Sequence, residues 1–201
     1  MNPRANSVDQ LAKLYNVVIG VALALSINTL IDVHAAYFPV KPDLLPLFCA
    51  FLVTVIPFHH GASRHLYATY VEDGGSTRIK SGALALDFLI LFVEGCLFVA
   101  LAAVIGNPSA FSTVMLALLL VDCAWGFLSH LAFTGAQAQN AERKWSVINL
   151  VAAAVLILTI LILPRIFAGW TTEVQECVAM ICILRSICDY AKTWKFYFPD
   201  A

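Results

Sequence analysis

Charged side chains are scarce in this chain of 201 residues. Asp, Glu, Lys and Arg together make up 12% of it, whereas apolar residues make up 61%. A soluble domain usually has about 25% charged and roughly 45–50% apolar residues. So few charges could not cover the surface of a chain of this length in water. The composition therefore excludes an ordinary soluble domain and predicts a membrane protein.

Sequence motifs that mark many enzymes and nucleic-acid-binding proteins are also missing. The chain contains no glycine-rich phosphate loop, no Gly-x-Ser-x-Gly, no His-Glu-x-x-His and no Cys-x-x-Cys. It also has no basic run of the kind that binds nucleic acid. We therefore expect no enzymatic activity, no cofactor and no direct binding of nucleic acid.

Apolar stretches long enough to cross a bilayer recur along the chain. A hydrocarbon core of about 30 Å takes about 20 helical residues. Six segments are predicted: 11–31, 44 into a histidine-rich stretch at 56–70, 82–105, 111–133, 145–163 and 173–190. The last is the weakest, because its strictly apolar part covers only 177–184, and it could instead lie in the headgroups. The expected fold is an all-α membrane helix bundle, a single transmembrane domain over residues 1–201.

The distribution of basic residues predicts the orientation. With six spans, one side of the membrane holds Arg4, Lys13, Arg64, Arg78, Lys80, Arg143, Lys144, Lys192 and Lys195. The other side holds only Lys41 and Arg165. The positive-inside rule then places both termini in the cytoplasm and the protein in the inner membrane. Five spans would move Lys192 and Lys195 to the outside, which fits the rule less well.

Three acids are expected inside the spans, where each costs a few kcal/mol unless it meets a partner or water. Asp87 and Glu94 are seven residues apart on one helix, so they share a face about 10 Å apart. Asp122 lies near the middle of another helix, followed by Gly126 and Ser129 on the same stripe. Such a small and polar stripe suits close packing against a neighbouring helix.

Counting along the helices places several of these groups at similar depths. His59 or His60, Asp87 and His130 are expected to converge in the cytoplasmic half, while Glu94 and Asp122 lie deeper. A water-filled vestibule would accommodate them all. These residues are the candidates for a pore lining or a proton relay. Purely structural pairing of Glu94 and Asp122, or a salt bridge of Asp87, is the alternative.

The histidine-rich stretch allows several roles. His59, His60 and His65 point about 100° to 140° apart around one helix, so they cannot all ligate one ion. A metal or haem site would need a further helix. The stretch could equally mark the point where a helix leaves the membrane. We also expect a cytoplasmic docking motif, formed by Pro57, Gly61, Arg64, His65, Arg78 and Lys80.

A second ion pair is expected on the last predicted segment. Arg185 and Asp189 are spaced to pair along one helix face, at the membrane interface.

The segment "IPFHHGASRHLYATYV" resembles a Pro-Phe-x-His-Gly-x-x-Arg-x-Leu pattern of small multi-pass membrane proteins encoded beside type VI-B CRISPR and RADAR-type anti-phage systems. The matching residues are Pro57, Phe58, His60, Gly61, Arg64 and Leu66. The resemblance implies an accessory membrane protein that modulates an immune complex in prokaryotic defence. It supplies no catalytic residues. The Arg-x(4–6)-His ribonuclease pair of some such proteins is not present here.

The leading functional hypothesis is a homo-oligomeric pore-like or accessory membrane protein. Six short helices leave little room for a wide conduit inside one copy, so a ring of copies would line it with Glu94, Asp122 or His59. A proton-coupled secondary transporter that uses the buried Asp, Glu and His residues is an alternative, although no internal repeat is visible. A haem- or metal-binding membrane enzyme is a further alternative. A cytoplasmic protein complex is a possible partner.

Overall fold

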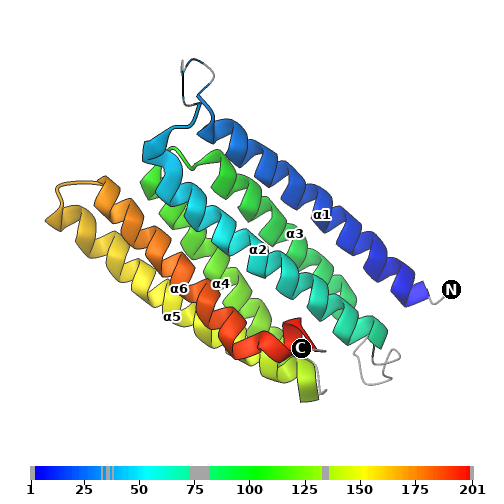
Figure 1. Ribbon diagram of the computed structural model, residues 1–201. Coiled ribbons are helices and arrows are strands. Elements are labelled where there is room, and N and C mark those ends of the chain that lie inside the picture. The colour runs from blue at the N-terminus through cyan, green and yellow to red at the C-terminus, as the bar shows by residue number, and fades with distance from the viewer. Residues whose placement is uncertain are drawn as a thin grey trace.

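The protein is a bundle of six long helices (Figure 1). The computed structural model describes residues 3–32, 34, 37, 39–72, 82–132 and 136–199. The helices are α1 Pro3–Leu30, α2 Leu45–Tyr67, α3 Ala83–Ala103, α4 Pro108–Ala132, α5 Ala136–Ile166 and α6 Thr172–Tyr197. A 3-10 turn, η1 Pro42–Leu44, leads into α2, and a π-helical turn, η2 Ala68–Glu72, continues it. The described residues contain no strand beyond an isolated bridge between Ile31 and Val40, so the all-α prediction is confirmed.

The helices run alternately up and down and close into a ring. In space the order is α1, α3, α4, α5, α6, α2 and back to α1. The N- and C-termini lie at one end of the bundle, here called the terminal end (Figure 1). The links α1–α2, α3–α4 and α5–α6 lie at the opposite end. Both termini therefore lie on the same side of the bundle, as predicted.

Five of the helical segments are long and apolar enough to cross a membrane. They are 5–30, 42–72, 83–103, 108–129 and 141–166. The sixth helix, α6, is more polar, but it runs alongside α2 and α5 rather than across an end of the bundle (Figure 1). Its polar residues Arg185 and Asp189 are buried against other helices. The pair therefore lies inside the bundle rather than on its outer surface, and α6 runs parallel to its neighbours along the bundle.

Three helices extend well beyond their predicted ends, and one of them is α1, which begins at Pro3 rather than at residue 11. α5 begins at Ala136 rather than Trp145, and α6 continues to Tyr197 rather than stopping near residue 190. The prediction followed the apolar run alone, whereas helical hydrogen bonding continues through polar residues at the bundle end. The longer α5 brings Glu142 into the helix, where it is completely buried.

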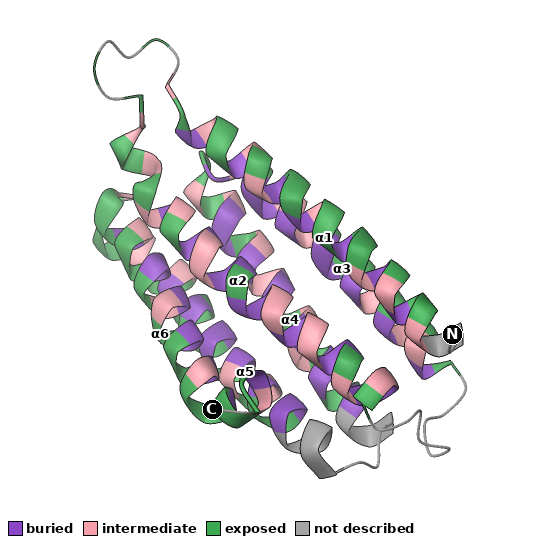
Figure 2. Ribbon diagram, turned by 45° about the vertical axis from the view of Figure 1, so that its right-hand side comes forward, coloured by how far each residue is buried: buried purple, intermediate pink, exposed green. Residues whose placement is uncertain are grey.

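Buried residues line the inward faces of the helices (Figure 2), and the ionisable ones among them lie in one half of the bundle. Toward the opposite end the core consists mainly of large apolar side chains: Leu47, Phe51, Phe98, Leu101, Phe111, Met115, Leu118, Leu156 and Val178. Toward the terminal end it contains acids, a histidine and an arginine: His65, Asp87, Glu94, Asp122, Glu142, Arg185 and Asp189. The buried ionisable groups therefore reach only about halfway through the bundle.

Pro57 lies inside α2 without ending the helix. Proline has no N–H, so the carbonyl of Val53, four residues earlier, lacks its helical donor. The Ser186 hydroxyl of α6 donates a hydrogen bond to that carbonyl. A neighbouring helix thus satisfies the backbone group that proline leaves free, as is required where no water is available.

Gly126 allows α4 and α5 to approach closely. A Cβ at this position would lie 3.0 Å from the backbone oxygen of Glu142 and would collide with the Ser146 side chain. Ser146 donates a hydrogen bond of 3.2 Å to the carbonyl of Cys123 on α4. The expectation of close packing at the stripe of Asp122 and Gly126 is confirmed.

This close approach predicts an asymmetry between two glycine substitutions. Gly126→Ala should lower the free energy of unfolding by about 1–3 kcal/mol, because the methyl group overpacks the interface between α4 and α5. Gly106→Ala, in the turn between α3 and α4, is the matched control, since nothing lies within 4 Å of a Cβ there. Thermal unfolding of both variants in detergent measures the difference. Equal melting temperatures would contradict the close approach.

Candidate functional site

His65 lies between two buried acids near the terminal end of the bundle. Its Nε2 is 3.1 Å from Asp87 Oδ2 on α3, and its Nδ1 is 2.9 Å from Glu142 Oε1 on α5. Asp87 also accepts hydrogen bonds from Tyr70 (2.7 Å) and Trp125 Nε1 (2.9 Å). We call these five residues the His65 cluster. It joins α2, α3, α4 and α5, with η2 supplying Tyr70.

The His65 cluster must hold an additional proton. A neutral imidazole has one N–H, yet both ring nitrogens of His65 face carboxylate oxygens. Either the ring is a cation or one of the two acids is protonated. The imidazolium lets both ring nitrogens donate charge-assisted hydrogen bonds to carboxylate oxygens, and these are stronger than neutral ones, so this is the arrangement that the geometry favours.

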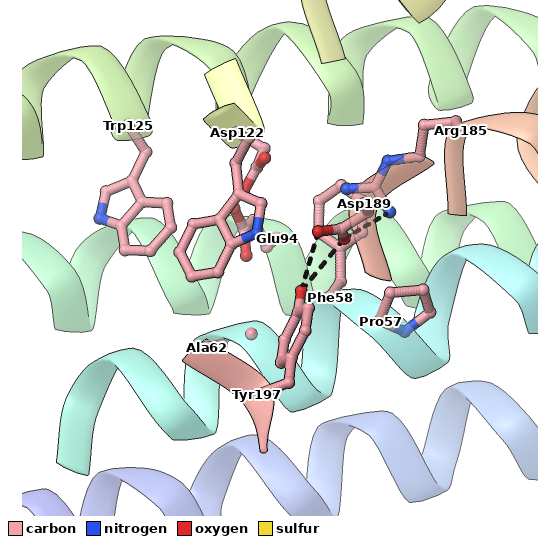
Figure 3. A pocket seen from close by; sticks show the side chains of 11 residues that line it. Pro57, Phe58, Ala62, Glu94, Asp122, Trp125, Arg185, Asp189 and Tyr197 are labelled. Carbon is pink, nitrogen blue, oxygen red and sulfur yellow. Dashed lines mark hydrogen bonds and ion pairs between the residues drawn. The ribbon is translucent and has the colours of Figure 1, made fainter. Parts of the chain in front are cut away.

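A second buried polar group lies deeper and includes α6. We call it the Arg185 cluster: Glu94, Asp122, Asn149, Arg185 and Asp189. Asn149 donates a hydrogen bond to Asp122 and accepts one of 2.7 Å from Arg185 Nε. Arg185 also pairs with Asp189 at 3.6 Å, as the sequence predicted. The carboxyl groups of Glu94 and Asp122 contact each other (Figure 3).

Aromatic side chains surround the Arg185 cluster. The guanidinium of Arg185 lies 4.3 Å from the ring centre of Phe58, a favourable cation–π contact. Tyr197 donates to both oxygens of Asp189 at 3.1 Å (Figure 3). The same tyrosine explains Gly61, because its hydroxyl would lie 3.1 Å from a Cβ there. Trp125 links the two clusters. Its Nε1 donates a hydrogen bond to Asp87 in the His65 cluster, and its side chain also lines the cavity beside Glu94.

The cavity between these groups is small. It offers about 10 Å³ of space, room for roughly one water molecule. The lining residues are Pro57, Phe58, Gly61, Ala62, Glu94, Asp122, Trp125, Trp145, Arg185, Asp189 and Tyr197. The described residues therefore do not form one vestibule that joins all the predicted groups: His59 and His60 border a separate groove between α1 and α2. Close packing of aromatic and charged side chains fills the space in which we expected water.

Glu94 and Asp122 are 1% and 6% exposed and point into the interior of the chain. They form the structural pair that we considered as an alternative. Their burial within one copy contradicts the prediction that they line a conduit between copies. Asp87 is salt-bridged, but its partner is His65 rather than His59 or His60.

The other predicted histidines do not join Asp87. The ring of His59 is 2.6 Å from Asn16 on α1 and stacks on Tyr15. His60 packs against Tyr197, with ring centres 4.6 Å apart. His130 belongs to α4, but its side chain lies outside the described residues.

The predicted docking motif is mostly not a surface. Pro57, Gly61 and His65 are buried, because this face of α2 packs against the bundle. Arg64 is partly exposed, but it pairs with Glu72 and donates to the carbonyl of Phe196 at 2.9 Å. Arg78 and Lys80 lie outside the described residues.

Sequence reasoning missed Glu142, Trp125, Asn149 and the tertiary role of Arg185. A signal for two of them was present: Glu142, Trp145, Asn149 and Ala153 recur at helical spacing and form one face of α5. A polar face that continues an apolar helix would have indicated burial against charged neighbours.

Among the described residues, no group of three His, Cys, Asp or Glu side chains is arranged to hold a metal ion.

Removing the buried arginine should be costly. Arg185→Met leaves Asp189 without its cation and Asn149 without a donor, so we expect a loss of about 3–5 kcal/mol of stability. Arg165→Met, at the exposed end of α5, is the control and should leave the melting temperature unchanged. Thermal unfolding in the same detergent compares the two. A similar small effect of both substitutions would show that the Arg185 cluster adds little to stability.

No family model, curated protein or solved structure matches this chain. Its function must therefore be inferred from the side chains that the fold brings together.

Proposed function

We propose that the protein is a multi-pass membrane protein that assembles into a homo-oligomeric pore, with α1 facing the conduit between copies. The observation that carries this proposal is a row of exposed residues on α1, spaced four apart: Asn16, Gly20, Ala24 and Asn28. Asn16 and Gly20 also border a groove between α1 and α2, where Asn16 contacts His59. Residues at this spacing lie along one side of a helix. The row runs through the part of α1 that is apolar enough to span a membrane.

The outward faces of two other spans differ from this row. On α3 the exposed residues include Phe88, Leu89, Phe92 and Val93, and on α5 they include Leu150, Val151, Leu158 and Leu161. Bulky apolar side chains suit contact with lipid, whereas small and polar ones suit contact with another helix or with water. α1 also exposes Val17 and Val21, but of these three helices it alone has such a row of small and polar residues, and we infer that this row faces other copies.

The interior of one copy supports the same conclusion. The cavity has room for about one water molecule, and the half toward the opposite end is packed with apolar side chains. An ion path through the centre of one copy would have to cross this packed half, whereas a path between copies would not.

Cysteine substitution tests the assembly. In a variant whose native cysteines are replaced, Ala24→Cys should give disulfide-linked dimers in oxidised membranes. Ala154→Cys, an exposed alanine on α5, is the matched control and should remain monomeric. Equal crosslinking at both sites would contradict the proposed interface.

Ion flux tests the conduit. Ala24→Phe should reduce ion flux in proteoliposomes toward background, because a large aromatic ring then replaces a methyl group in the row of α1 that faces the proposed conduit. Ala154→Phe should leave the flux unchanged. Flux that is equal in wild type, both variants and protein-free vesicles would overturn the pore.

A proton-coupled transporter is a second candidate, favoured by the acids of the His65 and Arg185 clusters. The two candidates differ in their response to Glu94→Gln. In the pore this residue does not contact the conduit, so ion flux should persist. In the transporter, uptake driven by a pH gradient should disappear.

An accessory role in prokaryotic defence, with a cytoplasmic protein complex as partner, is a narrower version of the proposal. It rests on the resemblance of the segment that contains Pro57 and Arg64, and on the basic residues at the terminal end. Lys144, Lys192 and Lys195 are exposed there. The positive-inside rule would place this end in the cytoplasm of a cell with an inner membrane. Co-purification after crosslinking through these lysines would identify such a partner.

A further inference from the structure

Three buried polar atoms without a hydrogen-bond partner belong to residues around one cavity. They are Glu94 Oε1, Trp145 Nε1 and Arg185 Nη1. All three residues line the cavity of the Arg185 cluster, and each is at most 6% exposed. Arg185 Nη1 lies 3.6 Å from Asp189, which allows an ion pair but is too long for a hydrogen bond. Buried polar groups are nearly always paired, so three beside one small space point to a ligand.

The size and the chemistry of the cavity select the ligand. About 10 Å³ accommodates a single water molecule. The indole and guanidinium groups supply N–H donors, and Glu94 supplies a carboxyl oxygen. Water accepts two hydrogen bonds and donates two, so it can satisfy all three groups. A metal cation would meet the two donors, whereas an anion would meet Glu94, Asp122 and Asp189.

We propose that this cavity binds one water molecule, and that the water connects a proton shared by Glu94 and Asp122 to Asp189. Two carboxyl groups in contact cannot both be ionised without strong repulsion. Among the described residues the interior holds five buried acids, Asp87, Glu94, Asp122, Glu142 and Asp189, against two possible cations, His65 and Arg185. A bound proton reduces the net negative charge.

Groups from every neighbouring helix act on this acid pair. Besides Arg185 and Asp189 of α6, they are Asp87 of α3, His65 of α2, Tyr15 of α1 and Asn149 of α5, which donates a hydrogen bond to Asp122. Arg185 pairs with Asp189 and hydrogen-bonds to Asn149, so it does not neutralise both Glu94 and Asp122. The shared proton therefore belongs to these two acids.

The residues around the cavity also indicate from which end of the bundle the proton on Glu94 and Asp122 exchanges. Asp189 accepts from the Tyr197 hydroxyl, and the ring of Tyr197 packs on His60, which is only partly buried. These residues lead to the terminal end. In the other direction Phe98, Met115 and Leu118 close the core. The proton site is thus reached from the terminal end only, and it does not depend on the assembly of copies.

Infrared spectroscopy in lipid nanodiscs tests the protonated acid. The carbonyl stretch of a buried carboxylic acid should be present in the wild type and should be lost or shifted in Glu94→Gln. Glu173→Gln, an exposed acid at the start of α6, is the control and should leave the band unchanged. Asp122→Asn provides a second test if the first variant does not fold. Absence of the band, or a band unaffected by both substitutions, overturns the shared proton.

Deuterium exchange of the same band tests the water. In D2O the band should shift quickly in the wild type, because the water carries deuterons to the acid pair. Trp145→Phe removes one of the donors that hold the water and should slow the exchange several-fold. Trp170→Phe, away from the cavity, should exchange like the wild type. A wild-type band that does not exchange, or equal rates in Trp145→Phe and wild type, overturns the water link. Neither measurement depends on ion flux, so failure of the pore and failure of this site can be told apart.

Discussion

Hydrocarbon offers no hydrogen-bond partners, and this one constraint explains most of the polar contacts in the bundle. Each buried charge must find its partner on another helix. The Val53 carbonyl freed by Pro57 therefore accepts from Ser186, and His65 lies between Asp87 and Glu142. Because these contacts cross between helices, they also fix which faces of the helices meet. The apolar surfaces alone would allow many rotations of each helix.

The overall architecture could be predicted because it depends on the lengths of the apolar segments, which can be read directly from the sequence. A bilayer requires about 20 apolar residues per span, so counting them locates the helices. The depth of Glu94 and Asp122 follows from a rise of about 1.5 Å per residue. Pairing between Glu94 and Asp122 was a reasonable alternative because the two residues were expected at similar depths. Arg185 and Asp189 were paired correctly because residues four apart share a helix face.

What could not be predicted depends on helix rotation and on neighbours in the ring. Depth placed His59, His60 and Asp87 together, but rotation decides which histidine faces the bundle. The apolar residues of α2 at Phe58, Ala62 and Leu66 already indicated the face on which His65 lies. Glu142 lies outside the predicted segment 145–163, because the apolar run begins only at Trp145. The contact of Asn149 with both Asp122 and Arg185 needs the spatial order of α4, α5 and α6, which the sequence does not specify.

The division of the interior into a polar and an apolar half has an electrical consequence. Polarisable groups screen a field, whereas packed hydrocarbon does not. Most of a voltage applied across the membrane would therefore fall over the half that contains Phe51, Phe98 and Met115. The ionisable side chains lie outside that region, so charge that moves among them does not cross the part of the voltage that falls there. The titratable groups are therefore coupled more closely to the compartment at the terminal end than to the compartment on the other side.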